Sequence, residues 1–286
     1  MSAYSAYIIM RKNLYSHDSL SNIGLTQGSV ITNCVAEGYS GSKVWGVIIT
    51  PKCDLAHEGK VNTVHYLPML NVEDWLNSIG KMELIEEWMK EVKNNIINAM
   101  KLWGIDSDFL SMGVRYEDLL AICNAREPKP KKKAEFEKLC KAYFSHDDDL
   151  FKQFIQKSKN VSKYVKGMVG GNNHHYYLLE DWNNQNNLKV IILRDIRRIN
   201  IDVARKFVKG FDYTEYREEF FKQNDLNYDS KEKSFDGFYY LEVQIQSPFI
   251  EHIIQSFSYN FNRVGVTDME SRSFDIFMDI LKRTLA

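Results

Sequence analysis

The spacing of apolar residues predicts three short strands near the start of the chain. The first is expected at Gly28–Asn33, before a turn-rich connection. Val44–Thr50 is an almost continuous apolar run that ends at Pro51, which is typical of a strand buried on both faces. Val61–Pro68 alternates more clearly and should pair beside it. Three strands so close together favour a tightly curled sheet.

Helical spacing replaces this pattern from Asn71 to about Lys166. Its clearest part predicts one long amphipathic helix, because a single stripe contains Ile85, Trp88, Met89, Val92, Ile96, Met100 and Trp103. Further helices are expected near Tyr116–Arg126, Ala134–Phe144 and Asp147–Lys157. The prolines and lysines of Glu127–Lys133 predict an exposed break between them.

Strand character returns at His174–Glu180 and Leu188–Asp195, on either side of a polar turn. Since two strands alone are marginal, we expect them to join the first three in one five-stranded sheet. Phe238–Val243 fits either a short strand or the start of a helix. Ser247–Gln255 predicts a helix that begins with Ser as N-cap and Pro at the first helical position, and a last helix is expected at Glu270–Leu285.

The predicted fold class is therefore α+β: a small five-stranded barrel, split by a helical insertion and followed by C-terminal helices. The expected organisation is a first half of the barrel at 1–70, the insertion at 71–170, and a second half at 171–200. Residues 201–286 should form a C-terminal helical region that packs on the barrel.

Composition limits the possible partners. Among 286 residues, 44% are hydrophobic and the formal net charge is -1, so there is material for a core but no general basic excess. Nucleic-acid binding would therefore need a local patch. The candidate patches are Lys129–Lys133, Lys157–Lys166, and the group Arg194, Arg197 and Arg198.

The cysteines and the apolar runs favour a cytoplasmic protein. Cys34, Cys53, Cys123 and Cys140 form no C-x-x-C pair, and no stretch has the roughly 18 apolar residues that a membrane span requires. The N-terminus lacks the pattern of a signal peptide. Gly167–Gly171 lacks the context of a nucleotide-binding loop, and no Walker-type motif occurs. We expect no cofactor, no metal and no membrane contact.

The segment Pro51–Lys60 is the most unusual local sequence, because it collects Cys53, Asp54, His57 and Glu58. These side chains could form a metal site, with a ligand from His174-His175, or a Cys–His nucleophile pair. The structural alternative, which we favour, is a turn in which Asp54 binds backbone N–H groups. In that case Cys53 is buried and His57 and Glu58 are exposed.

Two stretches carry a family resemblance. Gly46–Leu55, followed by Val64–Pro68, resembles a strand–turn–strand segment of the PemK/MazF-like fold, a Src-homology-3-like barrel best known from bacterial endoribonuclease toxins. Within that resemblance, three motifs are similar to a group of uncharacterised prokaryotic proteins of mobile-element or anti-phage defence loci. They are Cys53–Leu55, His175–Leu178, and Ser247–His252 continuing to Arg263–Gly265.

The resemblance implies a barrel of this type and raises the question of ribonuclease activity. Such activity would need a basic residue in the first barrel loop and a hydroxyl residue after a later strand. The chain offers Lys43 in that loop, but Met69 and Leu70 occupy the place of the hydroxyl residue. The catalytic candidates are Lys43, Thr50, Asp54 and His57.

A binding role is the preferred hypothesis. Glu251 and His252 fall on the first turn of a predicted helix, where Glu251 should cap the helix and pair with Arg197 or Arg198, while Arg263 ties the helix end to the barrel. The candidate binding residues are Cys53, Asp54, Arg197, Arg198, His252 and Arg263. We expect a non-catalytic binding or accessory protein that docks a partner protein or nucleic acid, with an endoribonuclease toxin as the alternative.

Overall fold

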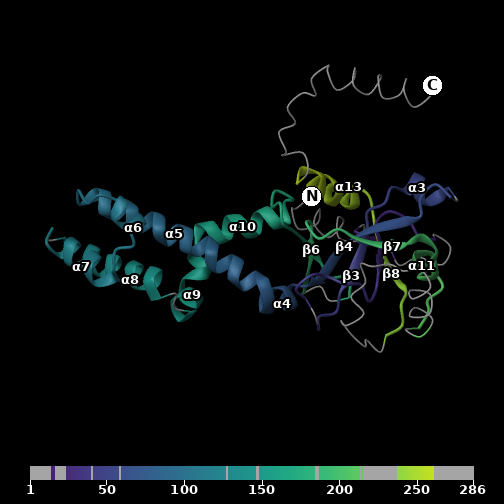
Figure 1. The fold of residues 1–286 in the computed structure, drawn as a ribbon, viewed down its shortest axis with the longest axis horizontal. Coiled ribbons are helices and arrows are strands. Elements are labelled where there is room, and N and C mark those ends of the chain that lie inside the picture. The colour runs from purple at the N-terminus through teal and green to yellow at the C-terminus, as the bar shows by residue number, and fades with distance from the viewer. Residues whose placement is uncertain are drawn as a thin grey trace, which may run out of the picture.

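A computed structural model of the chain describes residues 14–16, 24–39, 41–57, 59–126, 128–145, 148–183, 187–212, 214 and 237–260. A curled sheet forms one end of this structure, and a helical arm extends from it (Figure 1). The helices of the arm all lie between the fourth and fifth strands in the sequence. Within the described ranges, no helix is both long and apolar enough to cross a membrane.

All strand pairs in the described residues are antiparallel and belong to one sheet, in the order β1-β8-β2-β3-β4-β6-β5, with β7 paired to β4. The strands are β1 (Tyr15–Ser16), β2 (Ser29–Ile31), β3 (Trp45–Ile48), β4 (Thr63–Asn71), β5 (Tyr176–Glu180), β6 (Leu188–Ile192), β7 (Arg197–Asn200) and β8 (Leu241–Ile245).

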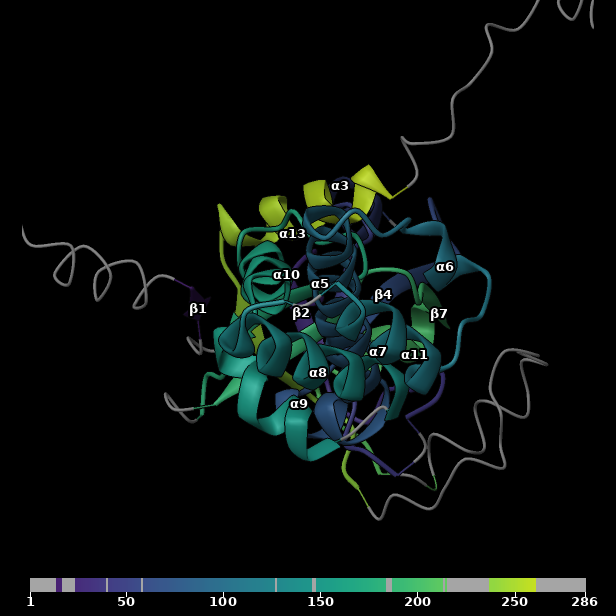
Figure 2. The ribbon, with the colours of Figure 1, turned by 90° about the vertical axis from the view of Figure 1, so that its left-hand side faces the viewer.

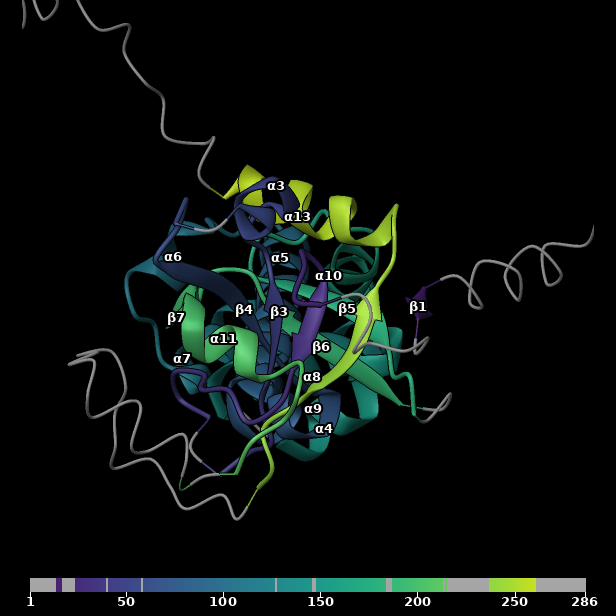
Figure 3. The same cartoon turned by 90° about the vertical axis from the view of Figure 1, so that its right-hand side faces the viewer.

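The long strand β4 is the branch point of the sheet. One of its edges pairs with β3, while the other is divided between β7, opposite Thr63–Tyr66, and β6, opposite Met69–Asn71. Two short strands on one edge allow the sheet to bend where they separate. The result is a curled half-barrel (Figure 3).

The helices of the arm begin directly at the end of β4. Helix α4 (Val72–Trp75) passes through a π-helical turn, Leu76–Gly80, into the long helix α5 (Lys81–Leu102). Helices α8 and α10 pack along α5, and α7 packs on α8 (Figure 2). They are α6 (Asp108–Ser111), α7 (Tyr116–Asn124), α8 (Pro130–Ser145), α9 (Asp148–Phe154), a 3-10 turn (Ile155–Lys157) and α10 (Lys159–Val169).

Three helices lie against the half-barrel outside the arm. They are α3 (Lys52–Ala56), α11 (Ile201–Lys206) and α13 (Phe249–Tyr259). Both α13 and α3 lie at one end of the sheet (Figures 1 and 3). Ile250 and Ile253 of α13 are buried among residues of the inner sheet face.

Both faces of the sheet are buried, in two separate apolar cores. Along β4, Leu67 and Met69 belong to the inner core with α13, whereas Tyr66 and Leu70 belong to the larger core that continues into the arm. The same alternation occurs in β6, so Val190 and the residue after it lie in different cores. Burial on both sides explains why these strands are nearly continuous apolar runs.

The two ends of the strand order approach each other on the inner side. The Tyr15 hydroxyl of β1 donates a 2.6 Å hydrogen bond to the carbonyl oxygen of Glu180, the last residue of β5. The Tyr15 ring also packs edge-on against Trp182, which contacts Trp45 in the same way. Side chains therefore bridge the two ends of the curled sheet in this region.

The predicted strands are confirmed, and the mixed α/β architecture with a curled antiparallel sheet agrees with the expected class. The five predicted strands are contiguous in the order β2-β3-β4-β6-β5. The sheet differs from the prediction by including β1, β7 and β8, and for Phe238–Val243 the strand alternative is nearer to the observed β8.

Some predicted helix boundaries are wrong. The break expected up to Lys133 ends earlier, because Pro130 is the first residue of α8, a position where its missing N–H costs no hydrogen bond. Ser247 does not cap α13: Pro248 occupies the N-cap position and no side chain bonds there. The predicted helix at Glu270–Leu285 lies outside the described residues.

Gly46 in β3 provides a test of packing between strands. A Cβ at this position would lie 2.7 Å from the Cys34 sulfur and 2.8 Å from Cδ2 of Tyr66, which are both buried. We expect Gly46→Ala to lower the free energy of unfolding by about 1–3 kcal/mol through overpacking, measured by urea titration.

Gly167→Ala is the matched control, because the nearest atom to its added Cβ would be at an ordinary 3.5 Å and alanine favours the helix. Equal stability of the two variants would contradict the packing argument.

Candidate functional site at the base of the arm

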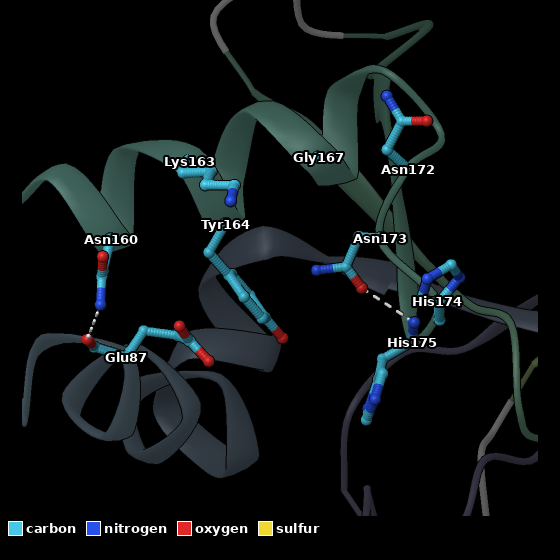
Figure 4. A pocket seen from close by; sticks show the side chains of 9 residues that line it. All are labelled: Glu87, Asn160, Lys163, Tyr164, Gly167, Asn172, Asn173, His174 and His175. Carbon is cyan, nitrogen blue, oxygen red and sulfur yellow. Dashed lines mark hydrogen bonds between the residues drawn. The ribbon is translucent and has the colours of Figure 1, made fainter. Parts of the chain in front are cut away.

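A cavity of about 430 Å³ opens where the arm leaves the half-barrel. It lies between α5, α10 and the segment that joins α10 to β5 (Figure 4). Most of the lining residues have polar side chains: three amides, two imidazoles, an ammonium group and a carboxylate lie around one phenol ring. The lining residues are Glu87, Asn160, Lys163, Tyr164, Gly167, Asn172, Asn173, His174 and His175.

Helix α10 contributes to the cavity through residues spaced by one helical turn. Asn160, Tyr164 and Gly167 follow the i, i+4, i+7 spacing, so they share one face of the helix. The start of α10 is fixed by Glu91 of α5, which accepts hydrogen bonds from the Ser158 hydroxyl at 2.6 Å and the Asn160 backbone N–H at 3.0 Å. This face is therefore held against α5.

The two histidines are positioned by a tight turn after α10. The carbonyl oxygen of Gly167 accepts from the backbone N–H groups of Asn172 and Asn173, at 2.9 and 3.0 Å. The side-chain oxygen of Asn173 then accepts from the N–H of His175 at 2.8 Å, a bond drawn in Figure 4, and from that of Tyr176 at 3.0 Å. With this oxygen occupied, the NH₂ group of Asn173 is directed toward Tyr164 (Figure 4).

One carboxylate behind the cavity joins the arm to the sheet. Glu83 of α5 accepts hydrogen bonds from the hydroxyls of Tyr164, on α10, and Tyr176, on β5; the second is 2.9 Å long. Burial, together with the adjacent carboxylate, raises the pKa of both phenols, so they remain donors. Glu83 therefore connects α5, α10 and β5.

Exposed lysines of α10 lie beside the cavity, and Lys163 is part of its lining. Lys159, Lys163 and Lys166 are exposed and follow the i, i+4, i+7 spacing along α10, beside the face that lines the cavity. On the other side, the pKa of His175 is lowered by burial and then by the charge of Arg194. His175 is thus neutral near pH 7, and its ring can donate or accept a hydrogen bond.

Metal-ligand clusters and buried thiols were the remaining candidates for chemistry in the described residues. In the described part of the chain, no group of three His, Cys, Asp or Glu side chains is placed to hold a metal ion. Three cysteines are buried, and burial raises the pKa of Cys123 to about 11 and of Cys140 to about 12. These thiols are therefore protonated and inaccessible.

The residues of the Cys-Asp-Leu turn are placed on the short exposed helix α3. Cys53 is exposed, so its predicted burial is wrong. The Asp54 carboxylate pairs with the Lys60 ammonium at 2.5 Å, and this partner lowers the pKa of Asp54. Among the described residues, no backbone N–H of the turn donates to Asp54. His57 Nδ1 lies 2.7 Å from the carbonyl oxygen of Cys53, so this ring nitrogen is directed at backbone rather than at the thiol. His174 and His175 line the cavity by the arm instead of a site with this turn.

The other catalytic candidates have local structural partners. The Lys43 ammonium lies 4.6 Å from the ring centroid of Trp45, a cation–π contact. Thr50 is buried, and its hydroxyl oxygen accepts a 2.7 Å bond from the backbone N–H of His65. Among the described contacts, none joins Lys43 to Thr50, Asp54 or His57.

The remaining binding candidates are spread over the half-barrel. Arg197 pairs with Asp195 at 2.5 Å and Glu37 at 3.6 Å, in place of the predicted pairing with Glu251. Arg198 lies opposite His65 in the β4–β7 ladder. His252 of α13 forms a 2.8 Å hydrogen bond with the Tyr177 hydroxyl of β5. Arg263 lies outside the described residues.

A second polar cluster, unforeseen in the sequence, surrounds the buried amine of Lys189. This ammonium lies 3.2 Å from Asp181 and 2.7 Å from the side-chain oxygen of Asn71, and 3.5 Å from the ring centroid of Trp45. Only 3% of the Lys189 side chain and 7% of the Asp181 side chain are exposed. The cluster thus holds the β5–β6 connection to the start of the arm.

The sequence alone does not indicate this cavity as a site, although the basic run Lys157–Lys166 is visible in it. No separate helix is predicted at the position of α10. Val161, Tyr164, Val165 and Met168 would have indicated a helix with one apolar side. The proximity of Arg194 depends on the sheet pairing and has no local signal.

No protein-family model, curated protein or solved structure matches this chain with significance. The function is therefore inferred from the geometry and the charges of the described residues. The cavity at the base of the arm is the main candidate, since polar groups from three segments converge on it.

Loss of the Glu83 carboxylate should weaken the junction between arm and sheet. Glu83→Ala leaves the hydroxyls of Tyr164 and Tyr176 without their acceptor, so we expect a loss of roughly 2–4 kcal/mol in the free energy of unfolding by urea titration. Glu86→Ala, an exposed position on the same helix, should change it by less than about 0.5 kcal/mol. Equal effects of the two substitutions would contradict the conclusion that Glu83 stabilises the junction between the arm and the sheet.

Neutralising Asp181 should leave the Lys189 charge buried without its counterion. We expect Asp181→Asn to destabilise the fold by about 3–5 kcal/mol. Asp202→Asn, which loosens the exposed 3.9 Å pair with Arg205, should cost less than about 1 kcal/mol. Thermal and urea unfolding would measure both, and a mild effect of Asp181→Asn would show that the buried pair contributes little.

Proposed function

We propose that the chain is a non-catalytic nucleic-acid-binding protein, with phosphate groups held on the basic face of α10 beside the cavity. The observation that supports this most is the row of exposed Lys159, Lys163 and Lys166 along α10, of which Lys163 also lines the cavity. Rows of exposed lysines are the electrostatic feature that phosphate backbones recognise. The formal net charge of -1 is compatible with this, since the positive charge is concentrated locally.

The spacing of the lysines suits an extended backbone. Along a helix axis with a rise of about 1.5 Å per residue, Lys159 and Lys163 are about 6 Å apart, and Lys163 and Lys166 about 4.5 Å. Flexible ammonium groups can bridge such intervals to successive phosphates. Arg194 is close enough to His175 for its charge to lower the pKa of that ring.

The accessory role is supported by the resemblance of three motifs to proteins of mobile-element and anti-phage defence loci. We infer that the protein acts in the cytoplasm within such a system, where a protein partner could also dock on the arm. The adjacent strands β2-β3-β4-β6-β5 support a relationship of the half-barrel to the PemK/MazF-like barrel. That relationship remains part of the proposal.

The alternative, an endoribonuclease toxin, has weaker support. It would use Lys43, Thr50, Asp54 and His57, whose described contacts are with Trp45, His65, Lys60 and Cys53 respectively. A cleavage site needs a base and a charge-stabilising group that converge on one phosphate. Among these four candidates, no described contact joins a base to a charge-stabilising group, which favours binding.

Removal of the lysine row should weaken nucleic-acid binding and its dependence on salt. For a fluorescent single-stranded RNA, we expect the triple substitution of Lys159, Lys163 and Lys166 by alanine to reduce the slope of log K against log salt by about 2–3. Fluorescence anisotropy over a salt series measures the slope. The matched control replaces Lys129, Lys131 and Lys132 by alanine. These lysines are exposed and lie outside the cavity, so the control removes the same charge elsewhere.

An equal effect of both triple substitutions would indicate only general electrostatic attraction and contradict the proposed site. The absence of RNA binding by the unaltered protein would overturn the proposed function. Cleavage of the RNA during the titration, visible on a denaturing gel and relieved by Lys43→Ala, would instead favour the ribonuclease.

A further inference from the structure

We propose that the cavity at the base of the arm receives one unpaired nucleobase, and that Glu87 favours a base with an exocyclic amino group. This inference rests on the proposed function and extends it, because it specifies single-stranded nucleic acid as the ligand. The lysine row would hold the backbone, while the cavity beside it would hold the base.

The cavity has a suitable size and wall. Its volume of about 430 Å³ lies in the range of small-molecule sites, and only a single planar ring system has to enter. In Figure 4 the Tyr164 ring stands between Glu87 on one side and Asn173 and His175 on the other. Tyrosine and histidine rings are the usual stacking partners of unpaired bases.

The cavity lining contains both hydrogen-bond acceptors and hydrogen-bond donors. Glu87 supplies a carboxylate, which can only accept hydrogen bonds when ionised. It is held by Lys90 at 2.5 Å, and the neighbouring backbone carbonyl of Glu87 accepts from the Asn160 amide at 3.2 Å. The Lys163 ammonium, also in the lining, supplies donors, whereas the Asn173 amide lies on the other side of the Tyr164 ring.

This combination discriminates between bases of equal size. Cytosine has an amino group that can donate to Glu87, and the ring nitrogen and carbonyl on the same edge can accept from a donor such as Lys163. In the same pose uracil has a carbonyl oxygen facing the carboxylate, and its N3–H faces the Lys163 ammonium, so both contacts are lost. A carboxylate should therefore prefer cytosine to uracil, and for the same reason adenine to uracil.

A duplex should not satisfy this site. In a base pair the amino groups are already bonded to the opposite strand, and the base lies inside the stack. Entry into the cavity would require the base to be extruded, at a cost in stacking and pairing energy. Single strands avoid this cost, so they should bind more tightly than a duplex of the same length.

The test compares short oligocytidylate and oligouridylate of equal length, and a duplex RNA, by fluorescence anisotropy at one salt concentration. We expect the unaltered protein to bind the cytidine oligomer about tenfold more tightly than the uridine oligomer. Glu87→Gln should bring this ratio close to one, because an amide can donate to the uracil carbonyl as well as accept. The salt slope should stay unchanged, since Glu87 contacts no phosphate.

Glu86→Gln is the matched control, as it removes the same charge from an exposed position of the same helix, and it should keep the preference. Circular dichroism verifies that both variants are folded. Equal binding of the two oligomers by the unaltered protein, or a preference that survives Glu87→Gln, would overturn the base-pocket inference. If removal of the lysine row still reduced the slope of log K against log salt, the proposed function would stand without the base-pocket inference.

Discussion

The double pairing of β4 is the constraint on which the rest of the structure depends. This strand has β3 along one edge and both β6 and β7 along the other, and its last residue, Asn71, continues directly into α4. No loop separates the sheet from the arm, so the direction of the arm is set by the curl of the sheet. Asn71 also accepts from the buried Lys189, which fixes the junction from the side of β6. The position of α5 relative to the half-barrel is therefore fixed by β4 and Lys189, independently of the packing of α10.

The candidate site follows from this geometry, because it occupies the angle between the arm and the sheet. Helix α10 returns along α5 and ends at a turn that leads straight into β5, whose place in the sheet is fixed by β6. Glu83 then joins α5, α10 and β5 through two tyrosine hydroxyls. A cavity with walls from all three segments is held in one shape before a ligand arrives. Such preorganisation reduces the entropy that binding would otherwise cost.

The sequence predicts the strands well because burial on both sheet faces leaves long apolar runs, as in Val44–Thr50. It predicts α5 for a related reason, since one side of a long helix is buried along its whole length. Pairing between distant segments leaves no such local signal: β8 lies beside β2, with Val243 opposite Val30. The same applies to the site. Its lysines form a visible basic run, whereas the meeting of Glu87, Asn160 and Asn173 results only from the packing of three separate segments.

The near-zero net charge of the chain conceals a separation of charge by depth. Glu83, Glu91 and Asp181 are each directed inward, where tyrosine, serine and lysine side chains bind them. The lysines of α10 are directed outward, and no acidic residue follows on that helix from Lys159 to Val169. Inward carboxylates cost desolvation energy, but their hydrogen bonds hold the helix that carries the outward cations. Charges that cancel in the total therefore need not cancel locally: Glu87 lies in the cavity lining, and over distances longer than about 10 Å salt screens more remote acids from the cavity. An acidic-to-neutral protein can in this way present a locally basic site whose shape is maintained by its own buried acids.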